Sequence, residues 1–403
     1  MKILHTADWH LGKRLYQTDL LDDSRLFVDW LLKKIQELEI DMLLIAGDVF
    51  DTTNPSSDAM QVYYDFLKGL VATGCRLVIT GGNHDSPAVL NAPREILKLL
   101  HVQVIGGACE KYEDEILPLP DRSGQIGAAV CAVPFLRDRD LKRSVEGESF
   151  EDRRLAIRAG LERRYALQYE EGRKEYPDVP LLGMGHLFMN GSATSDNDEK
   201  LHTIGTLDLF EASLFPPFDY LALGHIHRPQ KIAKKETIRY SGSPVALSFS
   251  EMKDEKLVVL VETEGKDITR IEEIKVPVFR KLERITGTLD EVEAKLSAYA
   301  KPEESLKSLA EVEIREEQRD PALADRAKVF FLTFQQPDIQ VLNWKFRFSQ
   351  QLRTADELFG ESTALTELTP NDVFDQWLAE NAGTDESKKL LGEAFHELLN
   401  GLN

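Results

Sequence analysis

Five of the nine histidines in this chain lie in short clusters with other residue types that bind metal ions. The clusters are Asp8-Trp9-His10, Gly47-Asp48-Val49-Phe50-Asp51, Gly82-Asn83-His84-Asp85, Gly185-His186 and Gly224-His225-Ile226-His227. Carboxylate, amide and imidazole groups without sulfur form a ligand set that suits manganese, iron, zinc and similar divalent ions. A carboxylate can bridge two such ions when they lie about 3.5–4 Å apart. The clusters therefore predict a site for two divalent metal ions.

A glycine directly precedes the ligand type in four of these clusters, at positions 47, 82, 185 and 224. A residue without Cβ lets the chain turn sharply as it leaves a strand and brings backbone close to a bound ion. One such string alone would be a weak signal. Five of them in succession, each after a short apolar run, are a strong one.

Short apolar runs and helical patterns alternate over the first two thirds of the chain. We expect strands at 1–6, 42–46, 76–80, 181–185, 220–223 and 257–261, and helices at 21–38, 56–73, 89–100 and 150–175. This alternation predicts an α/β fold with parallel strands. The polar clusters follow the strand ends, where open α/β sheets place their sites.

The pattern changes near Val276-Pro277, where we expect a small α+β unit at 276–348 with strands at 279–285 and 329–334 and a helix at 289–299. Residues 349–403 form the tail. Pro370 after a capping threonine predicts one tail helix to about residue 382, and Thr384 is expected to cap a second helix. The expected domains are therefore 1–275, 276–348 and 349–403.

Composition limits the class of protein further. The chain has 403 residues, 42% of them hydrophobic, and a net charge of −20, which argues against a general nucleic-acid binder. No apolar run reaches the roughly 18–20 residues of a membrane helix, and the N-terminus does not resemble a signal peptide. The three cysteines are far apart in sequence, which argues against a disulfide scaffold and favours a cytoplasmic location.

The strings HTADWHLGK, AGDVFDTTNPS, GNHDSP, ALGHIHRPQ and RYSGSPVALSFSE resemble the calcineurin-like metallophosphoesterases, and among them the nucleases of bacterial DNA repair. The resemblance covers residues 1–275 well and the remainder only in general layout. It implies a two-sheet α/β sandwich flanked by helices, followed by a small α+β capping domain and a helical tail that binds a partner.

The resemblance also assigns roles to individual residues. It implies that one metal takes Asp8, His10, Asp48 and His227, and that the other takes Asp48, Asn83, His186 and His225, with Asp48 bridging. His84 would be the catalytic histidine that protonates the leaving oxygen, with Asp85 orienting its ring. Asp51 stands where some relatives carry a second histidine, so we expect it to orient a ligand or a water. Lys13 and Arg14, just after His10, are candidates for phosphate contacts.

The function that the resemblance implies is a metal-dependent DNA exonuclease and endonuclease in repair, recombination and replication, most simply with Mn²⁺, although Mg²⁺, Fe²⁺ or Zn²⁺ would fit. Its partners would be DNA, an SMC-type ATPase and a second copy bound through the helices at 56–73 and 89–100. Two alternatives remain: a metallophosphodiesterase or phosphatase for small substrates, and an inert scaffold. The 128 residues after 275 favour the nuclease.

The segment 137–174 carries eleven Lys and Arg against nine Asp and Glu. It forms either a solvated helix with many ion pairs or a contact to the DNA backbone.

Overall fold

The computed structural model describes residues 1–142, 148–189, 211–303, 305–349 and 385–401, together with residues 371, 374, 375 and 378 of the tail. The chain divides into two compact units. One contains residues 1–314 and 325–345, and the other contains residues 315–324 and 346–403.

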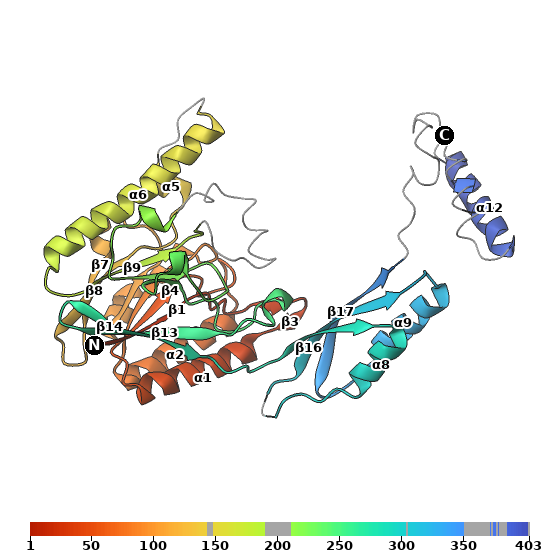
Figure 1. Ribbon diagram of the computed structural model, residues 1–403, viewed down its shortest axis with the longest axis horizontal. Helices are drawn as coiled ribbons and strands as arrows, with labels where there is room; N and C mark the ends of the chain where they lie inside the picture. The colour runs from red at the N-terminus through yellow and green to blue at the C-terminus, as the bar shows by residue number, and fades with distance from the viewer. Residues whose placement is uncertain are drawn as a thin grey trace. The chain divides into compact units, whose positions relative to one another are not determined.

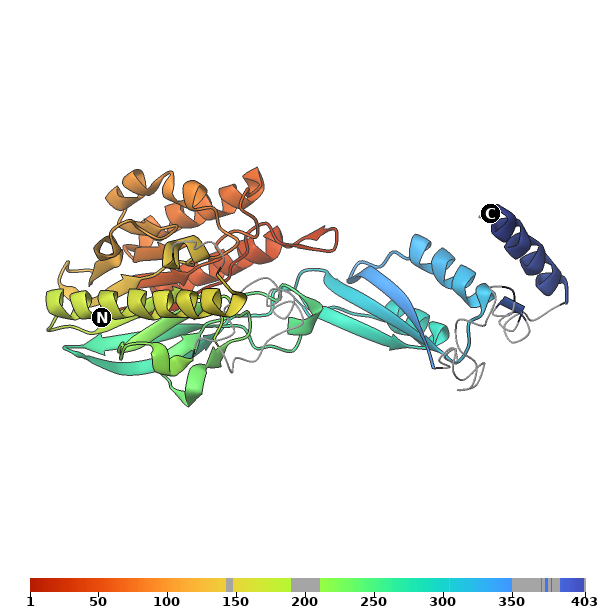
Figure 2. The same cartoon turned by 90° about the horizontal axis from the view of Figure 1, so that it is seen from above.

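Two six-stranded sheets pack face to face in the larger unit (Figures 1 and 2). The first sheet has the strand order β14 (Asp267–Lys275), β13 (Leu257–Glu264), β1 (Lys2–Thr6), β4 (Met42–Ala46), β5 (Arg76–Thr80) and β6 (Val102–Ile105). The second has the order β11 (Gln230–Lys231), β12 (Ile238–Tyr240), β10 (Tyr220–Gly224), β9 (Leu181–His186), β8 (Ile126–Ala132) and β7 (Ile116–Pro120). The expected α/β class and the two-sheet sandwich are confirmed.

The central strands of both sheets are parallel and buried on both faces. Strands β1, β4, β5 and β6 pair in parallel, as do β8, β9, β10 and β12. All five residues of β4 are buried, which is why this strand is uniformly apolar rather than alternating. Leu44, Met184 and Tyr220 belong to the core between the sheets.

Helices cover the outer faces of the sandwich, and both terminal signals of one of them are visible in the sequence. Helices α1 (Leu21–Glu37) and α2 (Ser57–Thr73) pack on the first sheet, and α6 (Phe150–Glu175) packs on the second (Figure 2). The Ser56 hydroxyl accepts the N–H of Ala59 at the start of α2, and Gly74 ends this helix with φ +73°. No helix in the described part of the chain is long and apolar enough to cross a membrane.

The helix expected at 89–100 is instead two short helices, α3 (Pro87–Asn91) and α4 (Arg94–Leu99). Pro93 lies between them. Proline has no N–H to donate and its ring clashes with the preceding turn, so a helix breaks there. The remaining short elements are α5 (Asp138–Leu141), η1 (Tyr112–Glu115), η2 (Ala212–Leu214), η3 (Ile232–Lys234) and η4 (Phe249–Glu251).

A three-stranded sheet follows, in the order β15 (Leu282–Gly287), β16 (Ser308–Glu316) and β17 (Ile339–Phe348), with helix α8 (Leu289–Ser297). The strand expected at 329–334 is wrong, because these residues belong to helix α9 (Pro321–Thr333) and the turn after it. Tertiary packing decides the outcome: Phe331 stacks on Trp344 of β17 with ring centroids 4.9 Å apart.

Two sets of contacts link this third sheet to the sandwich within the larger unit. The Arg280 guanidinium forms an ion pair with Asp23 of α1, at 2.9 Å, and both side chains are largely buried. The short hairpin of β2 (Arg14–Leu15) and β3 (Thr18–Asp19) carries Tyr16, whose hydroxyl donates to Glu311.

The smaller unit contains helix α12 (Asp385–Gly401), which matches the second expected tail helix. The Phe374 ring stacks on Phe395 of this helix with centroids 3.8 Å apart. The first expected tail helix lies mostly outside the described residues, as does the Thr384 cap.

Candidate metal centre

The loops that follow β1 and β4 run side by side and bring the first ligand types together. The N–H of Asp8 donates to the Gly47 carbonyl at 3.0 Å, and the N–H of His10 donates to the Asp48 carbonyl at 3.0 Å. Three of these residues have left-handed backbone: φ is +54° at Asp8, +45° at His10 and +49° at Asp48. Such conformations cost non-glycine residues about 1–3 kcal/mol each and concentrate at functional sites.

His10 and His227 face each other through their Nε2 atoms, which lie 3.2 Å apart. On the other side of each ring, Nδ1 lies 3.2 Å from a carboxylate oxygen, that of Asp51 for His10 and that of Glu251 for His227. Because an ionised carboxylate only accepts hydrogen bonds, both Nδ1 atoms carry the proton. Two bare nitrogens therefore point at one another, and a cation between them would replace this repulsion with two ligand bonds.

Asp8 completes this group, since its carboxylate, His10 and His227 place one ligand atom each within 4.8 Å of one another. Its Oδ1 accepts the N–H of His225 at 2.8 Å. Its Oδ2 is buried and has no hydrogen-bond partner among the described residues. Burial raises the pKa of Asp8 to about 6. An unpaired buried carboxylate oxygen is costly, and a divalent cation would satisfy it, so these residues fit a metal.

The Asp48 carboxylate lies between two histidines that come from different sheets. Its Oδ2 is 3.5 Å from Nε2 of His10 and 3.2 Å from Nε2 of His186. Burial works to raise the pKa of Asp48, but the neighbouring His186 and His10 outweigh it and hold this pKa well below its usual range. For His186, burial lowers the pKa, but the Asp48 carboxylate outweighs burial and raises it to a net value of about 9.

Asn83 joins the remaining two histidines. Its Oδ1 is 3.0 Å from Nε2 of His186 and 2.9 Å from Nδ1 of His225. Gly82 allows the close approach, since a Cβ there would lie 2.1 Å from Oδ1 of Asp48. The structure therefore brings all seven expected ligand residues into one cluster.

His84 lies beside this cluster, but its expected partner does not orient it. Both oxygens of Asp85 accept backbone N–H groups, from Gly82 at 2.9 Å, Phe50 at 3.0 Å and Val49 at 3.1 Å. Nδ1 of His84 instead lies 2.8 Å from the backbone carbonyl oxygen of Asp51. The expectation that Asp85 orients His84 is therefore wrong: Asp85 ties two ligand loops together, and burial raises its pKa to about 6.

The three candidate substrate contacts occupy different places. The Asp51 carboxylate holds the His10 ring and also accepts from Nζ of Lys13 at 3.0 Å. Arg14 is exposed on β2 and donates to the Gln17 carbonyl at 2.7 Å. Lys13 therefore lies beside the metal ligands, and Arg14 lies on the hairpin.

Two further residues of the site, Glu251 and Lys256, were not predicted from the sequence. Glu251 is 1% exposed and accepts from Nδ1 of His227, and Nζ of Lys256 donates to its Oε2 at 2.6 Å. The nearby lysine and histidine outweigh burial and hold the pKa of Glu251 well below its usual range. The glutamate of the string RYSGSPVALSFSE was visible in the sequence, but its partner His227 lies 24 residues earlier.

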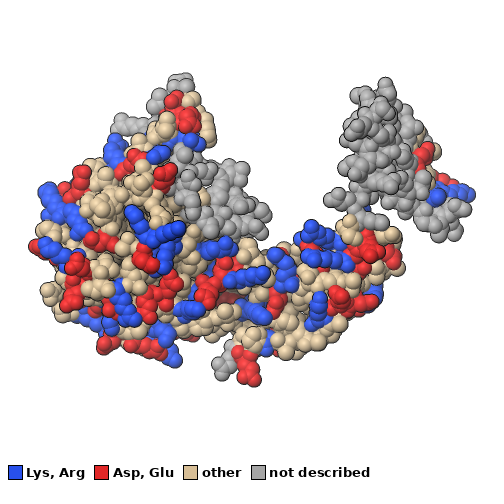
Figure 3. Space-filling view, in the orientation of Figure 1, with Lys and Arg blue, Asp and Glu red and all other residues tan. Residues whose placement is uncertain are grey.

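Many of the basic side chains of segment 137–174 are in ion pairs. Arg158 pairs with Glu162, Arg164 with Glu115 and Arg173 with Asp219. Figure 3 shows Lys and Arg interspersed with Asp and Glu over the face in view. These pairings favour the solvated, ion-paired helix over a dedicated DNA contact.

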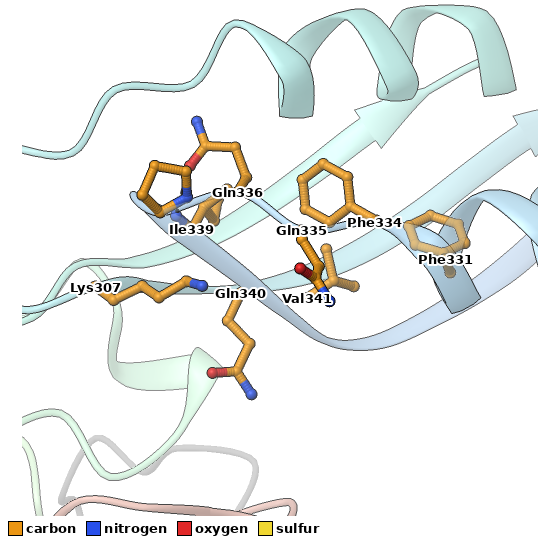
Figure 4. A pocket seen from close by; sticks show the side chains of 9 residues that line it. Lys307, Phe331, Phe334, Gln335, Gln336, Ile339, Gln340 and Val341 are labelled. Carbon is orange, nitrogen blue, oxygen red and sulfur yellow. Dashed lines mark hydrogen bonds between the residues drawn. The ribbon is translucent and has the colours of Figure 1, made fainter.

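A groove of about 490 Å³ lies between the end of α9 and β17, away from the histidine cluster (Figure 4). Its lining includes Phe331, Phe334, Gln336 and Lys307, with no carboxylate or imidazole among the described lining residues. Because hydrolytic metal chemistry needs such groups, the histidine cluster is the candidate site.

A two-sheet α/β sandwich with paired Asp, Asn and His ligands at its strand ends defines a metal-dependent phosphoesterase. Residues 1–229 match the calcineurin-like phosphoesterase family, and the chain belongs to that family. Residues 278–382 match the family described as the type 5 capsule protein repressor C-terminal domain.

The chain is also similar to curated bacterial relatives that carry the name of SbcD, the smaller component of the SbcCD nuclease. The relative from Escherichia coli (strain K12) is 36% identical over 405 residues, covering 100% of this chain and 98% of the relative. That from Rhodobacter capsulatus is 36% identical and covers 75% of this chain and 77% of the relative. That from Bacillus subtilis is 33% identical and covers 67% and 68%.

Proposed function

We propose that this chain is the nuclease subunit of an SbcCD-like complex, a divalent-metal-dependent DNA phosphodiesterase with exonuclease and endonuclease activity. The observation that carries the proposal is the Asp48 carboxylate between His10 and His186, flanked by the unpaired oxygen of Asp8. Similarity over the full length to relatives named as components of the SbcCD nuclease supports DNA as the substrate and an SMC-type ATPase as the partner.

The ligand assignment follows from the cluster. One ion is held by Asp8, His10, Asp48 and His227, and the other by Asp48, Asn83, His186 and His225. Two divalent ions held there would activate a water for attack on phosphorus and neutralise charge on the phosphoryl oxygens. Oxygen and nitrogen ligands without sulfur favour Mn²⁺ among the candidates.

The chain's own residues then act on the leaving group and the phosphate. The Asp51 carbonyl orients the His84 ring, and His84 holds a proton at Nε2 for the leaving oxygen. Lys13 lies beside the ligands and contacts a phosphate oxygen of the substrate. Arg14 on the hairpin reaches a phosphate further along the strand.

We propose the same division of the chain as the sequence suggests: a nuclease domain at 1–275, a capping domain at 276–348 and a linker with a partner-binding tail at 349–403. The separate family matches at 1–229 and 278–382 support a boundary near residue 276. In the described part of the tail, α12 exposes Leu390 and Leu398, at 63% and 68%, which suits a helix that docks on another protein.

The exposed apolar residues of α4 support a homodimer. Ile96 is 69% exposed and Leu99 is 80% exposed, whereas Leu97 between them is buried in the core of the subunit. Tyr64 and Val71 of the neighbouring helix α2 are also partly exposed, at 40% and 42%. A second copy that covers these side chains would remove them from water.

A phosphodiesterase for small substrates remains the rival, since the same ligands serve both. The test is to incubate the full chain with linear duplex DNA, circular single-stranded DNA and a small chromogenic diester, with and without Mn²⁺. Asp48→Asn is the matched control, because it removes the shared carboxylate and should abolish cleavage of every substrate. Manganese-dependent cleavage of DNA supports the proposal, and turnover of the diester alone would favour the rival.

A further inference from the structure

Glu251 is a heavily hydrogen-bonded carboxylate beside the candidate metal centre, and it comes from η4, outside the five ligand clusters. Five donors converge on its two oxygens: Nδ1 of His227 at 3.2 Å, the Ser248 hydroxyl at 3.1 Å, the Ser243 hydroxyl at 3.1 Å, the Leu247 N–H at 3.2 Å and Nζ of Lys256 at 2.6 Å. Each partner donates, so the carboxylate acts only as an acceptor.

This arrangement determines which nitrogen of His227 is bare. Nδ1 must carry a proton to donate to Glu251, so Nε2 presents its lone pair. That nitrogen lies 3.2 Å from Nε2 of His10. The ring of His227 therefore reaches the cluster in the tautomer that can bind a cation, before any cation arrives.

Lys256 and Ser243 hold the other end of the same residue. Nζ of Lys256 donates to the His227 carbonyl at 3.2 Å and to the Ser243 hydroxyl at 2.8 Å. The N–H of Ser243 donates to the same carbonyl at 3.1 Å. His227 is thus held at its backbone and at its ring by one buried group of residues.

We propose that Glu251 is a positioning residue that orients His227 for metal binding, with Lys256 neutralising the buried carboxylate. The inference rests on the proposed function, because it takes His227 as a ligand. It also separates the two ions. His186, a ligand of the other ion, has its Nδ1 2.9 Å from the neutral Ala46 carbonyl and does not depend on Glu251.

The competing explanation is a purely structural ion pair between Glu251 and Lys256. Glu251→Gln keeps the size of the side chain but leaves Lys256 without its counter-charge, which destabilises a buried site. Glu251→Gln combined with Lys256→Met removes both charges and avoids that penalty. Asp23→Asn is the matched control, because Asp23 forms a comparably buried ion pair with Arg280, away from the ligands.

The experiment titrates Mn²⁺ alone into the metal-free full-length chain by calorimetry, with thermal unfolding in EDTA measured in parallel. For the wild type we expect two bound ions. For Glu251→Gln and for the double variant we expect one ion with unchanged affinity and one bound about 10–100-fold more weakly. The double variant should show this loss even where its unfolding temperature recovers, and Asp23→Asn should unfold earlier while binding both ions normally.

Two outcomes would overturn the inference. The first is a double variant that binds both ions as the wild type does. The second is a loss of affinity in Asp23→Asn as large as that in Glu251→Gln, which would attribute the effect to general destabilisation. A wild-type chain that binds fewer than two ions would instead overturn the ligand assignment under the proposed function.

Discussion

Nδ1 of His84 lies 2.8 Å from the backbone carbonyl oxygen of Asp51, while the side chain of the same aspartate lies 3.2 Å from Nδ1 of His10. One residue thus orients both the candidate proton donor and a candidate metal ligand. The position of His84 is therefore coupled to the ligand loop and not to the neighbouring Asp85.

We expect His84→Ala to retain both metal ions while turnover of DNA falls by roughly 10²–10⁴-fold, the usual effect of losing a general acid. Elemental analysis after manganese loading and a cleavage assay check this together. His84 also lies within ligand distance of His10 and Asp48. Loss of an ion in the variant would therefore place His84 among the ligands and refute the assigned role.

Replacing Ile96 and Leu99 together with Asp should convert the proposed dimer to a folded monomer. Buried unpaired charge is strongly unfavourable at an interface, whereas these positions are exposed in the single subunit. Light scattering measures the mass, and thermal unfolding checks the fold. Leu155→Asp on α6, where Leu155 is 51% exposed, is the control and should leave the dimer intact. A variant that remains dimeric would show that another surface is used.

His5 predicts a specific loss of stability in acid. Burial lowers its pKa to about 3, and its Nδ1 lies 3.0 Å from the Tyr220 hydroxyl between the sheets. The unfolded chain binds this proton below pH 6.5 and the native chain does not, so stability falls as pH decreases from 6.5 towards 3. The slope should approach about 1.4 kcal/mol per pH unit, which amounts to about 2.3 kcal/mol between pH 6.5 and 4.5.

Urea unfolding of the wild type and His5→Gln in EDTA measures this contribution as the difference between two curves of stability against pH. Other titrating groups, including Asp8 and Asp85, are common to both proteins and cancel. Parallel curves from pH 7 to 4.5 would show that His5 is not the titrating group responsible.

Deleting residues 368–403 should leave the manganese-dependent nuclease activity of the isolated subunit intact, because these residues contribute no ligand. We expect the same deletion to abolish co-purification with the SMC-type ATPase partner and any ATP-stimulated cleavage. Pull-down with the purified ATPase measures the first effect. Undiminished binding by the truncated chain would exclude the tail as the docking element, and unfolding would show that it is structural.

The ligand cluster was predictable because its signals are local. Each ligand type follows a glycine or a short apolar strand, so residue type and order sufficed to select Asp8, Asn83 and His225. The parallel strands were equally visible, since β4 is uniformly apolar and short.

The parts that sequence could not predict depend on contacts between distant segments. Residues 329–334 form an apolar run that suits a strand or a buried helix, and only the packing of Phe331 on Trp344 decides between them. Adjacency suggested that Asp85 serves His84, but the backbone N–H groups of Val49 and Phe50 compete for that carboxylate. Glu251 meets His227 only after the chain has returned from β12.

Strand β1 lies between β4 and β13, so the first strand to be synthesised pairs on one side with a strand that ends at Glu264. Until that residue has left the ribosome, one edge of β1 has no neighbour, and an unpaired edge is a site of aggregation. The ligands span the same interval, from Asp8 to His227. A nascent chain therefore reaches a complete sheet and a complete ligand set at nearly the same length, and fragments that stop before β13 should be aggregation-prone.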